Sequence, residues 1–136
     1  MPRRLFALLA LSCFCLSPVT AQTTAFPVTP HGKLAAGFFA AVNAPTVEAL
    51  AKFQEANFSQ AALNRYPKEE RLKRNRQIRE QVGTLTLVSV VSSEASELVL
   101  AATVSNVPGL TVRLVLSFTD GANPKIDGLE IRGEQQ

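Results

Sequence analysis

The chain has 136 residues, of which 46% are hydrophobic and 18% are charged. This composition excludes a disordered or collagen-like protein, and the length suits one domain with its own apolar core. The formal net charge is +3, but Arg3 and Arg4 lie in a predicted export signal. Removing them leaves 12 of the 14 basic residues against 11 acidic ones, so the exported protein would carry only +1. Net charge therefore gives no argument for a nucleic-acid partner.

Residues 1–21 have the three parts of a bacterial signal peptide. Met1–Arg4 is basic, Leu5–Leu16 is apolar, and small side chains at Val19 and Ala21 occupy the positions that a signal peptidase requires. The apolar run rises about 18 Å as a helix, too little to span a hydrocarbon core of about 30 Å. We therefore expect cleavage after Ala21 and an exported protein, periplasmic or secreted, that does not span the membrane.

The exported chain offers few residues for metal or thiol chemistry. Both cysteines, Cys13 and Cys15, belong to the predicted signal, and His31 is the single histidine. These counts argue against disulfides, cysteine nucleophiles and His/Cys metal sites. Asp120 and Asn123 lack the further acidic ligands that calcium requires, so their segment is interpreted as a hairpin loop. We expect neither a metal nor another cofactor.

After a short lead-in over 22–28, residues 29–136 are expected to form one domain whose first half is helical. Thr29 before Pro30 predicts a capped helix start, and apolar side chains then recur every three or four residues. Gly83 is expected to end the last helix. The predicted helices lie near 30–43, 47–57 and 67–82, with one short extra turn after Ser59.

The second half changes to the two-residue period of strands. From Leu110 to Thr119 apolar residues alternate with polar ones, as in a half-buried strand. The consecutive Val90 and Val91 break the alternation and predict a β-bulge or a strong bend. Short turns between strands near 84–92, 97–105, 110–119 and 125–132 predict an antiparallel meander. The expected fold class is α+β, with about three N-terminal helices packed on a four-stranded antiparallel sheet.

The same periodicities predict which side chains are buried. One face of the sheet must pack on the helices, whereas the other would expose Val88, Val99 or Ala101 unless something covers it. Exposed apolar area of this kind marks interfaces, so we expect a homodimer packed through the sheet face. The predicted core consists of Leu34, Phe38, Val42, Leu50, Phe53, Leu72, Leu114, Leu116 and Phe118.

Several short motifs resemble one bacterial family. They are Thr29-Pro-His-Gly32, Phe38-Phe-Ala-Ala-Val-Asn43, Pro67-Lys-Glu-Glu-Arg71, Gly83-Thr-Leu85 and Ile126-Asp-Gly-Leu-Glu-Ile131. Across residues 26–132 the chain resembles the nuclear-transport-factor-2-like (cystatin-like) accessory domain. That domain is found beside β-lactamase-related serine hydrolases and carboxy-terminal-processing peptidases in exported proteins.

The resemblance implies helices folded over a curved sheet, with a cavity between them. Its motifs are structural, so no catalytic residues carry over to this chain. The sequence has neither a Ser-x-x-Lys nor a Gly-x-Ser-x-Gly motif, so the hydrolase chemistry itself is missing. A separate exported hydrolase is therefore one candidate partner.

A basic cluster occupies residues 65–79, where seven basic residues outnumber Glu69 and Glu70 and leave a local charge of +5. At about 100° per residue these charges scatter around a helix instead of forming the single face that nucleic acid would need. The Glu69–Lys73 and Glu70–Arg74 spacings favour a solvated, ion-paired helix. An acidic partner or an anionic lipid surface is the second interpretation, and nucleic acid is not expected.

Tyr66, Asp127 and Glu130 are the polar candidates for a cavity site. Some cone-shaped folds are isomerases or hydro-lyases that use a Tyr donor and an Asp base, and Tyr66 with Asp127 would fill these roles. The structural alternative places Tyr66 at a helix entrance and Asp127 at a turn or sheet edge. We favour a non-catalytic exported domain that binds a small molecule or a partner protein. The enzyme is the first alternative, and a protease-inhibitor-like or purely structural role is the second.

Overall fold

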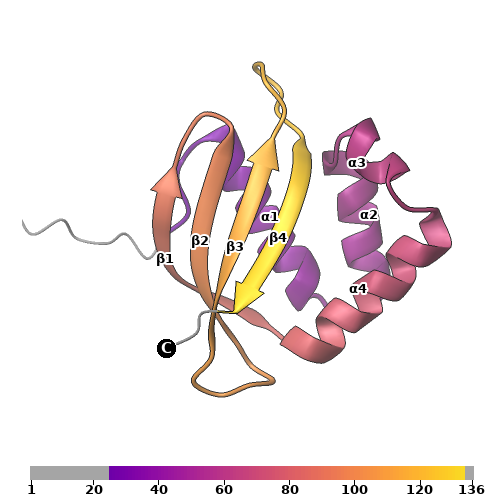
Figure 1. Cartoon of the computed structure of the whole chain (residues 1–136), viewed down its shortest axis with the longest axis vertical. Helices are drawn as coiled ribbons and strands as arrows, with labels where there is room; N and C mark the ends of the chain where they lie inside the picture. The colour runs from indigo at the N-terminus through magenta and orange to yellow at the C-terminus, as the bar shows by residue number, and fades with distance from the viewer. Residues whose placement is uncertain (1–24, 134–136) are drawn as a thin grey trace, which may run out of the picture.

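The computed structural model describes residues 25–133, so the predicted signal peptide lies outside the described residues. Within these residues, four helices precede four strands (Figure 1). This order confirms the α+β class, with helices packed against a four-stranded antiparallel sheet. The helices are α1 (Pro30–Asn43), α2 (Val47–Asn57), α3 (Gln60–Asn64) and α4 (Lys68–Val82), and the strands are β1 (Leu85–Ser93), β2 (Glu97–Val104), β3 (Thr111–Phe118) and β4 (Ile126–Gly133).

The helix boundaries follow from local capping chemistry. Thr29 caps α1, because its hydroxyl accepts a hydrogen bond from the Gly32 amide at 3.1 Å. Ser59 caps the short α3 in the same way through the Ala62 amide at 3.1 Å. Gly83 closes α4 with a φ of 72°, a backbone conformation that residues with a Cβ rarely adopt. The predicted helix boundaries are confirmed, α3 included, except that α4 begins at Lys68, one residue after the predicted Pro67.

The sheet is an antiparallel meander in the order β1-β2-β3-β4. Its regular centre pairs Leu100 with Leu114 and Leu98 with Leu116, which sets these leucines on one face. The helix α1 lies across that face, behind the sheet in Figure 1, while α2, α3 and α4 gather beyond β4. The apolar core lies between α1, α2 and this face of the sheet.

Most of the predicted core is buried. Phe38, Val42, Leu50, Leu114 and Leu116 have no exposed surface, and Phe118 is 5% exposed. Leu34 and Phe53 are half-buried and pack against the same cluster. The placement of Leu72 in the core is wrong: it is half-buried and lies outside the cluster. The reason is that α4 stands beside the sheet, so it buries only Asn75 and Val82.

The edge strand β1 carries the predicted irregularity. Its pairing with β2 shifts between Val90 and Ser92, which confirms a bulge at Val91, and again between Leu87 and Ser89. The two extra residues, Val88 and Val91, are 40% and 44% exposed. Bulges of this kind twist an edge strand out of the plane in which another strand would pair.

The lead-in segment packs on the domain. The Phe26 ring meets the Phe39 ring edge-on, with centroids 5.0 Å apart, and joins the margin of the core. The segment passes so close to α1 that a Cβ on Gly32 would collide with the Pro27 carbonyl oxygen. Glycine at this helix position therefore allows the chain to enter the domain at this angle.

Candidate functional site

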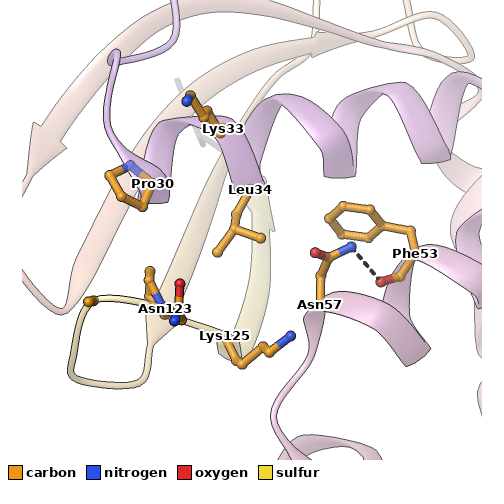
Figure 2. Close-up of a pocket in the computed structure, with 9 residues that line it drawn as sticks. Pro30, Lys33, Leu34, Phe53, Asn57, Asn123 and Lys125 are labelled. Atoms are coloured by element: carbon orange, nitrogen blue, oxygen red, sulfur yellow. Dashed lines mark hydrogen bonds between the residues drawn. The ribbon is translucent and has the colours of Figure 1, made fainter.

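The surface of residues 25–133 has several hollows large enough to hold a small ligand. The first lies between the start of α1, the end of α2 and the β3–β4 loop, and has a volume of about 440 Å³ (Figure 2). Two of its four polar side chains bond to the protein backbone. Asn57 donates to the Phe53 carbonyl at 3.0 Å, and Lys125 donates to the Ala56 carbonyl at 2.8 Å. These contacts close the end of α2 and leave Leu34 and Phe53 as the apolar wall.

The second hollow is a groove of about 380 Å³ between α4 and the sheet edge, which we call the α4–β4 groove. It combines half-buried apolar side chains with several cations. Its contributors come from all three helices beyond β4 and from β4 itself. They are Gln54, Phe58, Ala62, Arg65, Tyr66, Arg71, Arg74, Asn75, Gln77, Ile78, Gln81, Asp127, Gly128 and Leu129.

A buried amide pair forms the base of the groove. The Gln54 side chain donates to Asn75 Oδ1 at 2.9 Å, and the Asn75 side chain donates back to Gln54 Oε1 at 2.8 Å. Gln54 is 8% exposed and Asn75 only 2%. Because each amide satisfies the other, the pair joins α2 to α4 without leaving a buried polar group unpaired.

Arginines shape the helical wall of the groove. The Arg71 guanidinium donates to the carbonyls of Leu63 at 2.6 Å and Tyr66 at 3.0 Å, which fastens the turn between α3 and α4. The Arg74 guanidinium lies 3.8 Å from the centre of the Tyr66 ring and 3.3 Å from Glu70. Within residues 25–133, the guanidinium of Arg65 has no ion-pair or hydrogen-bond partner.

Asp127 forms the strand side of the groove where the sheet register breaks. The pairing of β3 with β4 shifts between Ser117 and Phe118, so Asp127 is the extra residue of a bulge. Its Oδ1 accepts a hydrogen bond from the Ser59 hydroxyl at 2.5 Å, and this same hydroxyl caps α3. The contact ties the α2–α3 junction to β4.

The structure brings two of the three predicted polar candidates together. Tyr66 and Asp127 both line the α4–β4 groove, whereas Glu130 does not. Glu130 pairs in register with Val115, so both side chains lie on the sheet face opposite the core. The Glu130 carboxylate forms an ion pair with the Arg132 guanidinium at 2.6 Å. The hydrogen bond from Arg132 lowers the pKa of Glu130.

The basic cluster does not form one surface. Arg79 donates to the Ala44 carbonyl at 2.7 Å and so connects α4 to the end of α1. Of the two predicted helix pairs, Glu70–Arg74 forms, and Glu69–Lys73 does not form among residues 25–133. The dispersal agrees with the solvated-helix interpretation of this segment.

The Gln54–Asn75 pair was missed by sequence reasoning, because polar residues on amphipathic helices usually face solvent.

His31 is half-buried against Phe118, with ring centroids 4.5 Å apart. In the described part of the chain, no three His, Cys, Asp or Glu side chains gather as a metal site would need. No helix between residues 25 and 133 is long and apolar enough to cross a bilayer.

Comparison of the chain with family models, curated proteins and solved structures finds no match.

Proposed function

We propose that this protein is an exported, non-catalytic domain that binds its ligand in the α4–β4 groove. The observation that carries the proposal is the lining, in which half-buried Phe58, Ile78 and Leu129 lie beside Arg65, whose guanidinium has no partner among the described residues. The volume of about 380 Å³ falls in the range of about 300–1,000 Å³ typical of ligand sites. Membership of the nuclear-transport-factor-2-like accessory domains, with a cone-shaped cavity, is part of this proposal and rests on the sequence motifs.

The polar side chains of the groove support binding more than catalysis. The Asp127 carboxylate accepts a hydrogen bond from the Ser59 hydroxyl, and the Tyr66 ring forms a cation–π contact with the Arg74 guanidinium. Tyr66 is 38% exposed, so its hydroxyl is not sequestered from water. A general acid–base pair would need an enclosed site in which both groups reach one substrate atom.

Ligand binding is tested with decanoate, an amphipathic anion, by chemical-shift mapping on ¹⁵N-labelled mature protein. We expect shifts at Ile78 and Leu129 that saturate. Ala62→Arg, which fills the groove from α3, should abolish them. Ala61→Arg is the matched control, because Ala61 lies on the same helix but outside the groove. Equal effects of the two variants, or no saturable shifts in the groove, would contradict the proposal.

The enzyme alternative is a small isomerase or hydro-lyase, and it is favoured by one observation: Tyr66 and Asp127 line the same groove. In this case Asp127 would be the base and Tyr66 the donor. Turnover of an enolisable substrate that Asp127→Asn abolishes, while the fold is retained, would replace the binding proposal with this one.

We also propose a homodimer through the outer face of the sheet, and a separate exported hydrolase as a partner. Exposed Val88 and Val91 and half-buried Val99 support the dimer, whereas Ala101 is only 7% exposed and contributes little. Light scattering at tens of micromolar protein measures the molar mass in solution, and the mass of a monomer would refute the homodimer. The hydrolase partner rests on the family resemblance and would be sought by purification from periplasm.

A further inference from the structure

The β4 strand presents an open edge to the groove. On one side β4 pairs with β3. On its other side, the pairing found within residues 25–133 is a single parallel bridge between Phe58 and Ile126. There the Ser59 amide donates to the Ile126 carbonyl at 2.9 Å. The chain thus begins a fifth strand against β4 and then turns away into α3.

The alternation of the ladder identifies the backbone groups that remain open. The Phe118 amide donates to Ser96 on the β2 side, so the neighbouring Ser117 directs its backbone groups to β4 and pairs with Gly128. Every second residue of β4 from Gly128 onwards then bonds to β3. Leu129, which lines the groove, and Ile131, which follows it along the strand, direct their amides and carbonyls the other way, away from β3.

We propose that the α4–β4 groove takes an extended segment of a partner protein that carries acidic side chains and adds to β4 as a fifth strand. This inference rests on the proposed binding function and names its ligand class. Leu129 and Ile131 would supply main-chain hydrogen bonds, as in other recognition by strand addition. Apolar side chains of the segment would meet Ile78 on the helix-facing side.

Charge favours an acidic segment. The groove lining contains Arg65, Arg71 and Arg74 against the single carboxylate of Asp127, which the Ser59 hydroxyl already engages. Within residues 25–133 the exposed Arg65 guanidinium has no partner in the groove lining, so a carboxylate there gains an ion pair without breaking a contact to this part of the chain.

The test uses a capped hexapeptide in which glutamate and valine alternate, titrated into ¹⁵N-labelled mature protein. We expect saturable shifts at the Leu129 and Ile131 amides. N-methylation of the valines leaves every side chain in place but removes N–H donors, and should weaken binding at least five-fold. Arg65→Ala should weaken it about three- to five-fold, as for an exposed ion pair. Lys73→Ala, which removes a cation from α4 outside the groove, should have no effect.

Three outcomes overturn the inference. The first is that N-methylated and unmodified peptides bind equally, because strand addition requires the backbone donors. The second is that the glutamate peptide causes no shifts at 5 mM, and the third is that a lysine–valine peptide binds as well as the glutamate–valine peptide. If decanoate binds in the groove while the peptide does not, the proposed function stands and the strand-addition inference alone fails. If neither probe binds, both fail.

Discussion

The buried Gln54–Asn75 amide pair gives the sharpest prediction about what holds the helices beside the sheet. We expect Asn75→Leu, which conserves the branching of the side chain, to lower the free energy of unfolding by about 2–4 kcal/mol. The variant loses two hydrogen bonds worth about 1 kcal/mol each and leaves a buried Gln54 amide without its partner. Gln54→Met should lose at least as much, because it leaves the Asn75 amide without its partner, and Asn75 is only 2% exposed against 8% for Gln54, so water replaces the lost contacts less readily.

The double variant Gln54→Met/Asn75→Leu should recover most of this loss, to within about 1 kcal/mol of the parent protein. Replacing both partners removes the unpaired buried group, and the transfer to apolar side chains offsets the lost hydrogen bonds. Urea unfolding of the four proteins, followed by circular dichroism, gives the coupling energy as a double-mutant cycle. If the two single losses simply add, the amides do not act as a pair and our account of the α2–α4 contact is refuted.

Three further outcomes follow from packing, backbone conformation and charge. Phe38→Ala should cost about 3–5 kcal/mol in urea unfolding, as for a fully buried aromatic side chain, and a loss under about 1 kcal/mol would contradict its core position. Gly83→Ala should cost more than the strain of about 1–3 kcal/mol expected for its positive φ, because the new Cβ meets Ser105 and Asn106. Gly109 has a φ of 81° and no atom within 4 Å of the Cβ that alanine would add, so Gly109→Ala should cost the backbone strain alone. Equal losses of unfolding free energy in the two variants would refute the predicted collision at Gly83. The pKa of Glu130, followed by NMR titration, should lie below its ordinary value and rise in Arg132→Gln; its stabilising effect is present at neutral pH and is lost as the pH falls through the folded-state pKa.

Features set by neighbouring residues could be predicted from the sequence. The caps at Thr29 and Ser59 depend on an amide three residues away, and both were predicted. The bulge at Val91 was predicted as well, because it shows as a break in a two-residue period. These signals are local, so they survive whatever the tertiary arrangement is.

Features set by docking could not be predicted in the same way. Leu72 has the spacing of a core residue, but its burial depends on where α4 lies relative to the sheet. The Gln54–Asn75 contact joins residues 21 positions apart, and nothing in either helix alone marks an amide as buried. Tyr66 and Asp127, predicted as cavity candidates, both line the groove, whereas the outward direction of the Glu130 side chain follows from a register that the bulge at Asp127 shifts by one residue.

The two ends of the sheet differ in a way that bears on assembly between chains. At one end the bulged β1 resists pairing with a further strand, while at the other Asp127–Leu129 of β4 form the strand side of a groove walled by α4. Growth of a continuous intermolecular ribbon needs two compatible edges on every copy. A neighbouring sheet would have to pass α4 to pair with this part of β4, whereas a single strand is narrower. The same geometry that would admit one peptide therefore protects the protein from edge-to-edge aggregation at high concentration.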